Sequence, residues 1–423
     1  MIVENNKQLK KFLKDFKSKE SIILPIEQDS NLHPQKSKLS LLYINTFDDE
    51  YVLPINHNEC LNIDLPNLKT KNKVYTLDRK KLLHFLDLDN VIDVSMMSYM
   101  RTGKVLELDN LNTTAHDFLN MKFYKKKNIN TVIPVLKHIE KCRKISTMLQ
   151  NNIEKYSEYV NVSYNDEILN NLSFIEKNGL MTTEGKVFSE YNLYTSTGRP
   201  SNRFGGINFA ALNKKDGSRK KFISRFKNGV LVEMDFDAYH LRLIADKINY
   251  EFPKGSVHEH MAQFYGVDYE EAKRLSFQYL YGYIPEDVIQ INPYFSKVHD
   301  YIEGLWNIYK NDDFVESDIY KRRIYKENLL DMNANKLFNY TIQLMETENN
   351  MKVLSALIPE IREYKSKLIL YSYDSFLLDF NIEDGLDYLM KVKNILEQDK
   401  KYPVKVSWGL NYHDMEDITE KFV

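Results

Sequence analysis

The sequence predicts an α/β fold in two parts, each built from short apolar strands and amphipathic helices. Three observations support this prediction. Residues 22–56 are rich in strand signals and are followed by helical patterns, residues 136–158 form one long amphipathic helix, and residues 230–236 form a buried strand that a helix follows. The length of 423 residues, 43% of them hydrophobic, suits two or three domains with real cores.

The first part alternates strands and helices as far as about residue 145. Polar turn residues separate the apolar runs SIILPIEQDS, LSLLYINTF and YVLPIN, which we expect to be strands. VYTL, the helical DRKKLLHFLDL and NVIDVSMMSYMRTG follow. The next helix is predicted from apolar residues at helical spacing, and we expect it to join the two parts: Leu136, Ile139, Ile145, Met148, Leu149 and Ile153.

The second part opens with a polar, glycine-rich stretch, TSTGRPSNRFGGINFAALN. GVLVEMDF then predicts a buried strand, and AYHLRLIADKI predicts a helix. DYEEAKRLSFQYLYG predicts a further helix with Asp268 as its N-cap. Near the C-terminus, KLILYSYDSFLLDF predicts two strands that meet in a hairpin at Asp374–Ser375.

Charge and cysteine content narrow the class of protein. The formal net charge of −2 lacks the basic surplus usual in nucleic-acid binders, although charge can be segregated locally. Local basic clusters do occur, and each is either a binding patch or ordinary solvated surface: Lys125, Lys126 and Lys127; Lys214 and Lys215; Arg219, Lys220 and Lys221; Arg322 and Arg323. Cys60 and Cys142 are too few for a disulfide framework or a cysteine-based zinc site.

Targeting signals are absent from the pattern. The first residues, MIVENNKQLKKFLKDF, contain no apolar core of a signal peptide, and no apolar run reaches the roughly 18 residues of a membrane span. We therefore expect a soluble protein with no membrane partner in a reducing compartment. The expected location is the cytoplasm, or the host cell cytoplasm if the protein is viral.

Asp235 and Asp374 stand out by position. Asp235 closes an apolar strand, and Asp374 lies at the predicted hairpin tip. A carboxylate in such a place is either a turn residue or a functional group on a rigid frame. Each residue alone favours the turn interpretation, so the surrounding motifs decide.

Seven motifs follow one another through the second part. They are TSTGRPSN, GGINFAAL, MDFDAYHLRLIA, SVHEHMAQFYG, AKRLSFQYLYG, NKLFNYTIQ and SYDSFLLDF. In this order and spacing they resemble the motifs of family A DNA polymerases, the group typified by bacterial DNA polymerase I and several phage replicative enzymes. The first resembles T-x-T-G-R-(L/I)-S-S, the third D-Y-S-Q-I-E-L-R, the fifth K-x-x-x-(F/Y)-x-x-x-Y-G and the last H-D-E. The resemblance covers about residues 190–423 and, more weakly, residues 20–145.

The resemblance implies a template-directed DNA polymerase of phage-type replication or repair, which adds dNTPs to the 3′ end of a primer–template DNA. Asp235 and Asp374 would be catalytic and would hold two Mg²⁺ ions, with the backbone carbonyl of Phe236 as a further ligand and Mn²⁺ as an alternative ion. The chemistry agrees independently, because nucleotidyl transfer needs divalent metals that are held by a few carboxylates and by phosphate oxygens.

The motif AKRLSFQYLYG predicts a nucleotide-binding helix face. Lys273, Phe277 and Tyr281 recur every four residues, so they share one face. By resemblance, Lys273 would hold the triphosphate, Phe277 would pack on the sugar and Tyr281 would lie near the templating base. The alternative is an amphipathic core helix whose lysine reaches solvent.

Four polar residues are expected by resemblance to contact DNA. Arg199 would reach the primer terminus or the minor groove. Asn339 and Gln343 would contact template and primer from one helix face, and Asn208 would do so from the glycine-rich loop. For each of them the alternative is a polar surface residue.

Several positions depart from the family pattern. His240 replaces the acidic residue that screens the 2′ position of the sugar, which puts sugar selectivity in doubt, although a bulky imidazole could still block a 2′-hydroxyl. Ser375 replaces the glutamate after the second aspartate, and Tyr373 replaces the preceding histidine. Tyr269 replaces an arginine that contacts the triphosphate.

Two further changes concern positive charge. Arg274 could substitute at the triphosphate, but it lies on another helix face, and Asn335 replaces the arginine of the R-x-x-x-N-x-x-x-Q motif. These losses would lower triphosphate affinity unless a partner supplies the missing charge.

The first part resembles the RNase H-like 3′–5′ exonuclease domain of the family, which needs four carboxylates around two metals. Glu27 matches its D-x-E motif, in which Pro25 replaces the aspartate, and Asp93 matches its middle aspartate. The final Y-x-x-x-D motif is missing from HIEKCRKI. We expect a vestigial domain with weak or no nuclease activity that guides DNA or supports the structure.

The resemblance also sets the expected domains. They are an exonuclease-like domain (1–145), a reduced thumb or connector (146–190), and a right-hand polymerase domain whose palm (191–250 and 331–423) flanks the fingers (251–330). A reduced thumb implies a weak grip on duplex DNA. A processivity or replisome partner is therefore a further expected partner.

Two alternatives to efficient DNA synthesis remain. One is a polymerase-fold protein that binds primer–template DNA with little or no synthesis, which Ser375, Tyr269 and Asn335 favour. The other is a polymerase that tolerates ribonucleotides, which His240 favours. A working exonuclease is disfavoured by Pro25 and by the missing final motif.

Overall fold

The computed structural model of this chain describes residues 1–108, 113–120, 133–156, 162–202, 207–213, 215–328 and 330–422. Of the predicted basic clusters, Lys125, Lys126, Lys127 and Lys214 lie outside these ranges, as does the Gly205–Gly206 pair of the glycine-rich stretch. The chain divides into an N-terminal unit, Met1–Lys177, and a C-terminal unit, Asn178–Val423.

The N-terminal unit contains a mixed sheet of five strands in the order β3-β2-β1-β4-β5. Strands β1, β2 and β3 pair antiparallel, whereas β4 pairs parallel with both β1 and β5. Its elements are α1 (Asn6–Ser18), β1 (Ser21–Glu27), β2 (Leu39–Asn45), β3 (Glu50–Pro54), β4 (Val74–Thr76), α2 (Arg79–Phe85), β5 (Val91–Asp93), α3 (Val94–Thr102), β6 (Glu107–Leu108), β7 (Thr113–Thr114), α4 (Ala115–Asn120), α6 (Val135–Tyr156) and α7 (Val162–Asn178). The strands and helices predicted for this part are found, but the helix that was expected to join the two parts, α6, lies within this unit, and α7 is the helix that reaches the boundary.

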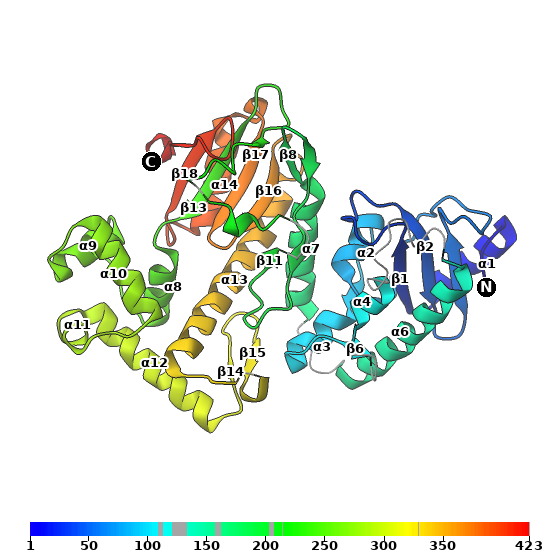
Figure 1. Ribbon diagram of the computed structural model, residues 1–423, viewed down its shortest axis with the longest axis horizontal. Helices are drawn as coiled ribbons and strands as arrows, with labels where there is room; N and C mark the ends of the chain where they lie inside the picture. The colour runs from blue at the N-terminus through cyan, green and yellow to red at the C-terminus, as the bar shows by residue number, and fades with distance from the viewer. Residues whose placement is uncertain are drawn as a thin grey trace. The chain divides into compact units, whose positions relative to one another are not determined.

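Side-chain alternation along β1 explains why helices cover both faces of this sheet (Figure 1). Successive strand residues point to opposite faces. Ile22 and Leu24 join the core that Ile139 and Ile145 of α6 complete. Ile23 points the other way, into the core formed with α1 and α2. Because both faces are buried, β1 is continuously apolar from Ile22 to Ile26 rather than alternating with polar residues.

The C-terminal unit contains an antiparallel sheet of five strands in the order β16-β17-β13-β18-β19. Its strands are β8 (Leu180–Thr182), β9 (Gly185–Val187), β10 (Tyr191–Asn192), β11 (Ser201–Asn202), β12 (Phe222–Ile223), β13 (Val230–Phe236), β14 (Phe314–Glu316), β15 (Arg323–Tyr325), β16 (Lys367–Ser372), β17 (Ser375–Phe380), β18 (Val404–Gly409) and β19 (Glu416–Asp417). Its α-helices are α8 (Tyr239–Lys247), α9 (Val257–Tyr265), α10 (Tyr269–Tyr281), α11 (Glu286–Ile291), α12 (Pro293–Asn311), α13 (Ala334–Ile361) and α14 (Gly385–Glu397). Single 3₁₀ turns span Phe209–Ala211, Lys326–Asn328, Ile382–Asp384 and Thr419–Phe422.

The predicted hairpin between β16 and β17 is confirmed. Ser372 pairs with Ser375, so Tyr373 and Asp374 form a two-residue tip. Tyr373 adopts a left-handed backbone with φ of 60°, as a tight hairpin turn requires. The tip therefore holds Asp374 at the end of two buried strands.

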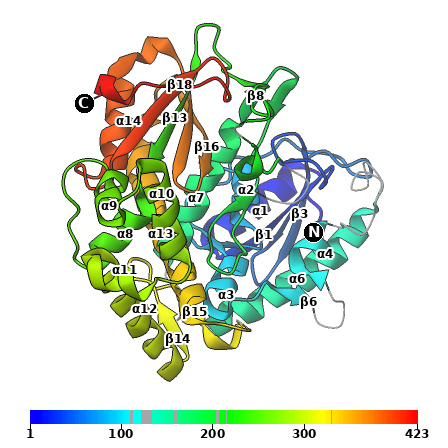
Figure 2. The same ribbon diagram turned by 60° about the vertical axis from the view of Figure 1, so that its left-hand side comes forward.

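Helices α8 to α13 form a second core beside this sheet. Leu241 of α8, Leu280 of α10 and Leu337 of α13 belong to one buried cluster. Figure 2 shows α8, α10 and α13 side by side next to the end of the sheet. The predicted cap of α10 is confirmed, because the Asp268 side chain accepts a hydrogen bond from the backbone N–H of Glu271.

A membrane-spanning helix would need a long apolar stretch. Within the part of the chain that the structure describes, no helix is both long and apolar enough to cross a bilayer.

Candidate active site

A cavity of about 620 Å³ opens in the C-terminal unit where β13 and the β16–β17 hairpin meet α10 and α13. Its wall combines carboxylates, cations, aromatic rings and amides from distant parts of the sequence. The lining residues are Arg199, Asp235, Phe236, Asp237, Ala238, Tyr239, His240, His258, Tyr269, Lys273, Phe277, Tyr281, Asn339, Gln343, Asp374 and Lys405.

Strand pairing brings Asp235 and Asp374 to the same wall of this cavity. Asp235 pairs across the antiparallel ladder with Ser375, the residue that follows Asp374. The backbone N–H of Phe236 donates to the carbonyl oxygen of Asp374 at 3.0 Å. The predicted placement of the two aspartates on adjacent strands is therefore found in the structure.

The Asp374 carboxyl lies in an environment that disfavours its negative charge. Burial and the negative charge of Glu346 raise the pKa of Asp374 above its usual range. A carboxylate so placed gains from a nearby cation, because the cation relieves the repulsion that burial intensifies.

Two charged residues of the cavity wall were not singled out by sequence analysis: Lys405 of β18, and Asp237, which directly follows β13. Lys405 pairs across the ladder with Asp235, and its Nζ lies 2.7 Å from Asp237. Burial alone would raise the pKa of Asp237, but the hydrogen bond and positive charge of Lys405 hold it below its ordinary value. No local pattern marks Lys405, since only the pairing of β18 with β13 brings it here.

The three predicted residues of α10 share one face and reach the cavity together. Lys273, Phe277 and Tyr281 all line it. The rings of Phe277 and Tyr281 stack with centroids 5.9 Å apart and planes inclined by 6°. The His258 ring lies 5.6 Å from Phe277, and burial lowers the pKa of His258 to about 4, so this imidazole is neutral at neutral pH.

His240 contacts both sides of the cavity wall. Its Nδ1 lies 2.6 Å from the hydroxyl oxygen of Tyr281, and its Nε2 lies 3.1 Å from a carboxylate oxygen of Glu346. Which ring nitrogen donates depends on the tautomer. If Nε2 carries the proton toward Glu346, Nδ1 accepts from the tyrosine hydroxyl.

Glu346 was not predicted as a site residue. It is fully buried on α13, and its two oxygens lie 2.8 and 3.0 Å from Nη2 of Arg199. Burial would raise its pKa, but the hydrogen bond from His240 and the charge of Arg199 lower it below the ordinary value. The available signal was its position three residues after Gln343, which places both on one helix face.

A tight turn places Arg199. Gly198 has a φ of 67°, which favours glycine, and a Cβ built there would lie 1.2 Å from Nη1 of Arg322, so any side chain would displace that guanidinium. The Arg199 guanidinium stacks on the Tyr373 ring at 3.6 Å. Arg199 is thereby held against both the hairpin tip and Glu346.

Asn339 and Gln343 face the cavity from α13. The Asn339 amide donates to the carbonyl oxygen of Tyr281 at 2.9 Å, and the Gln343 carbonyl oxygen accepts from the Thr197 hydroxyl at 3.3 Å. Two wall atoms, Arg199 Nε and Asn339 Oδ1, are buried without a hydrogen-bond partner. Such atoms favour a bound ligand or water that satisfies them.

Four predicted residues are not among those lining the cavity. The Arg274 guanidinium binds Glu271 and Gln278, each at 2.8 Å, on another face of α10. Asn208 is exposed just before the 3₁₀ turn Phe209–Ala211. The other two, Glu27 and Asp93, belong to the N-terminal unit.

Both predicted nuclease carboxylates have structural partners. Buried Glu27 forms an ion pair with Lys81. Asp93 caps α3 by accepting from the backbone N–H of Met96 at 2.8 Å, and it also accepts from that of Arg79 at 2.8 Å. Burial raises the pKa of Asp93 to about 7.

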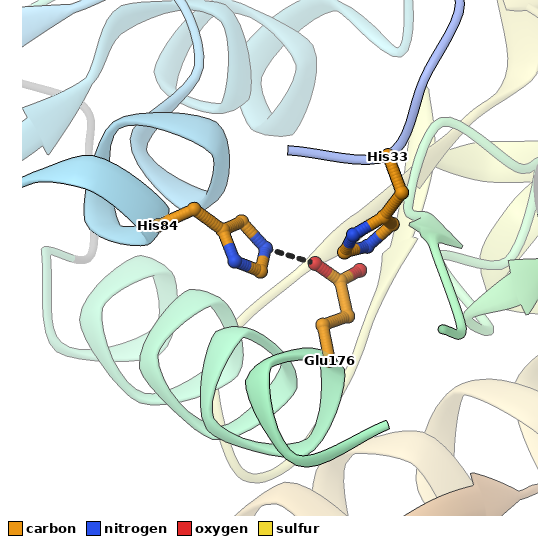
Figure 3. A group of neighbouring side chains, drawn as sticks. All are labelled: His33, His84 and Glu176. Carbon is orange, nitrogen blue, oxygen red and sulfur yellow. Dashed lines mark hydrogen bonds and ion pairs between the residues drawn. The ribbon is translucent and has the colours of Figure 1, made fainter. Parts of the chain in front are cut away.

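The described residues contain one group of three or more metal-ligand side chains whose ligand atoms all lie within 4.8 Å, namely His33, His84 and Glu176 (Figure 3). His84 Nε2 lies 2.9 Å from one Glu176 oxygen, and the Lys80 ammonium lies 2.5 Å from the other. Lys80 already neutralises the buried carboxylate, and a divalent cation would leave this pocket with excess positive charge. The group is therefore best explained as an ion-pair network that joins α2 to α7.

Comparisons with known proteins establish the fold. No family model matches the chain, and no curated protein matches it in sequence. Among solved structures, it is similar to the polymerase domain of Pol1 from M. smegmatis, solved in complex with DNA primer-template and dNTP. The TM-score is 0.71 at 12% sequence identity, over 98% of this chain and 99% of that chain. The predicted α/β fold class is confirmed, and the fold is that of a DNA polymerase domain.

Proposed function

We propose that this chain is a template-directed DNA polymerase of the family A type, which adds dNTPs to the 3′ end of a primer. The observation that carries the proposal is the composition of one cavity. Asp235 and Asp374 form one wall, and the Lys273, Phe277 and Tyr281 face of α10 lines the same space. Paired carboxylates opposite a cation and stacked rings suit a metal-bound triphosphate, a sugar and a base.

The residues fit a magnesium site of the predicted kind. Asp235 and Asp374 are oxygen donors on adjacent strands, and Asp374 lies beside a negative charge that disfavours its ionised form. Both, with the carbonyl of Phe236, would hold two Mg²⁺ ions, and Mn²⁺ is an alternative. When bound, the metal supplies positive charge to the phosphates and to the attacking 3′ oxygen.

Lys273 and Lys405 would bind the triphosphate. Tyr269 lacks the charge of the arginine expected at its position, but Lys405 lines the same cavity. Lys405 thus offers, from within the chain, a cation in place of the one that Tyr269 lacks. Its ion pair with Asp237 keeps it near Asp235 until phosphate oxygens compete for it.

The aromatic residues would position the rest of the nucleotide. Phe277 and Tyr281 stack nearly parallel and offer apolar faces to the sugar and the base pair. Neutral His258 packs on Phe277 without adding charge. His240, held against Tyr281, would lie where the 2′ position of the sugar is screened.

Arg199, Asn339 and Gln343 would contact primer and template. The unpaired Arg199 Nε and Asn339 Oδ1 atoms support this role, because DNA would satisfy them. Asn208 and Arg274 would act only outside the cavity.

The names palm, fingers and reduced thumb are proposed for the predicted residue ranges. A replisome partner and a cytoplasmic location are proposed as well.

The N-terminal unit is proposed to lack proofreading activity. Glu27 is paired with Lys81, and Asp93 is engaged as a helix cap. A two-metal nuclease needs carboxylates that are available to metals, so these partners support a guiding or structural role.

A second candidate function is primer–template binding without efficient synthesis. Ser375 favours it, because its hydroxyl donates to the carbonyl of Ser372 at 3.2 Å and provides no carboxylate. Primer extension with Mg²⁺ and dNTPs or rNTPs decides between the two, in wild type, Asp235→Asn and Asp374→Asn. Extension by wild type alone supports the polymerase. Tight primer–template binding without extension by wild type would favour the binding protein.

A further inference from the structure

We propose that Glu346 is the positioning carboxylate of the nucleotide site, holding Arg199 and His240 and, through His240, the hydroxyl of Tyr281. This inference rests on the proposed polymerase function. It places on helix α13 the acidic group that the family pattern has at position 240, where this chain has His240.

The first step is the burial of the Glu346 carboxylate. Its side chain is fully buried, and both oxygens lie within hydrogen-bonding distance of Arg199 Nη2. An ionised carboxylate in such a place is stable only with charged or hydrogen-bonding partners around it. The pKa of Glu346 lies below its ordinary value, so the group is a carboxylate and not a neutral acid.

The second step is the fixing of the His240 ring. One nitrogen lies 3.1 Å from Glu346 and the other 2.6 Å from the Tyr281 hydroxyl. A ring held at both nitrogens cannot rotate without breaking a contact. Glu346 therefore sets the ring plane of His240, and His240 sets the position of the Tyr281 hydroxyl.

The third step concerns Arg199, the other partner of Glu346. Arg199 is held between Glu346 and the Tyr373 ring at the hairpin tip, next to Asp374. Without Glu346, this largely enclosed guanidinium would lose its counter-ion and move toward phosphates or Asp374. One carboxylate thus positions the wall beside the sugar and the cation beside the primer end.

The consequence is that sugar selectivity depends on Glu346, a residue that does not itself line the cavity. A fixed imidazole against Tyr281 makes a rigid edge, which an extra 2′-hydroxyl would have to displace. When the anchor is lost, the ring gains freedom and the penalty for a ribonucleotide falls. The expected loss of dNTP over rNTP discrimination is about tenfold, with a smaller change in kcat for dNTPs.

The experiment measures kcat and KM for dNTP and rNTP incorporation by wild type, Glu346→Gln and Glu348→Gln. Glu348 is the matched control, because it is a buried glutamate on the same helix that binds Ser317 and Tyr320 outside the cavity. Glu346→Gln should lower the discrimination ratio about tenfold. Glu348→Gln should leave it at the wild-type value.

A second variant, Tyr281→Phe, tests the same chain of contacts even if Glu346→Gln does not fold. Tyr281→Phe removes only the hydroxyl at the far end of the chain of contacts and leaves the buried pair intact. It should lower the ratio in the same direction, and combining it with Glu346→Gln should add little, since both break one connection.

The outcomes separate the inference from the proposed function. If wild type extends primers while Glu346→Gln and Tyr281→Phe keep the wild-type ratio, the role of Glu346 is refuted and the polymerase stands. If Glu348→Gln lowers the ratio equally, the effect is general helix damage and the inference fails. If wild type extends no primer, the proposed function fails and the inference falls with it.

Discussion

Asp235 of β13 pairs directly with Lys405 of β18, so neighbouring strands carry a carboxylate and an ammonium group in one cavity wall. The Lys405 ammonium forms its ion pair with Asp237, at 2.7 Å, so it is shared between Asp237 and Asp235. The wall therefore carries both signs of charge, which suits a metal-bound triphosphate better than a free cation or anion.

Removing the charge of Asp235 or Asp374, the proposed metal-binding carboxylates, should abolish synthesis without unfolding the chain. Asp235→Asn and Asp374→Asn keep side-chain volume but lose the charge that would hold metal. We expect extension rates to fall by roughly a thousandfold. Gel-based primer extension and a DNA-binding assay measure the two effects separately, and extension that survives both substitutions would refute the site.

The two cavity lysines should contribute unequally to dNTP affinity. Lys273→Gln should raise KM for dNTPs by roughly tenfold or more, because Lys273 lines the cavity where the triphosphate is proposed to bind. Lys405→Gln should raise it by about two- to fivefold, as a half-exposed charge that is shared with Asp237. Arg274→Gln is the control, since Arg274 binds Glu271 outside the cavity, and an equal effect there would contradict the assignment.

Stability of the C-terminal unit should fall as pH rises from about 4.5 to about 7 because of Glu348. Burial raises the pKa of this carboxyl from its ordinary 4.5 to about 7. The folded state therefore holds the proton more tightly than the unfolded state, so stability is greatest below the unfolded pKa and is lost as pH rises through the folded pKa. The loss is on the order of 3 kcal/mol.

Urea unfolding at pH 5 and pH 8 measures this effect through tryptophan fluorescence. Trp306 and Trp408, the chain's two tryptophans, both lie in the C-terminal unit. Glu348→Gln should remove most of the difference between the two pH values. A wild-type chain that is equally stable at both would contradict the raised pKa.

Replacing Gly198 should damage the site through the backbone. Ala at this position faces a positive φ and a collision with Arg322, so Gly198→Ala should cost about 2 kcal/mol or more and displace Arg199. Gly304→Ala, at an exposed position of α12, is the matched control, because open space surrounds its Cβ and helix propensity favours alanine by up to about 1 kcal/mol. Thermal melting compares the two, and a neutral Gly198→Ala variant would contradict the turn geometry.

The N-terminal unit should not degrade primers at a rate that depends on Glu27. Wild type and Glu27→Ala should give equal, low release of nucleotides from single-stranded DNA with Mg²⁺, because Lys81 already pairs with Glu27. The assay uses the full chain without dNTPs. Rapid Mg²⁺-dependent degradation that Glu27→Ala abolishes would restore the nuclease hypothesis.

Much of the local structure could be predicted from residue order. The apolar runs predicted β1, β13 and the β16–β17 hairpin, and Asp268 predicted the start of α10, because periodicity and capping depend on neighbours within a few residues. The i, i+4, i+8 spacing also placed Lys273, Phe277 and Tyr281 on one face. Arg274 directly follows Lys273 in the sequence, so the same helical spacing places it on another face.

What the sequence by itself determined is therefore the identity of the elements and of the side chains that each presents, including Asp235 at a strand end and Asp374 at a hairpin tip. Only the tertiary structure decided that Lys405 would stand beside Asp235 and that Glu346 would anchor Arg199 and His240. The physical reason is that strand pairing and burial are non-local. A glutamate in the middle of a long helix looks like a solvated charge until packing encloses it, and enclosure then obliges it to hold the cation and the imidazole that line the site.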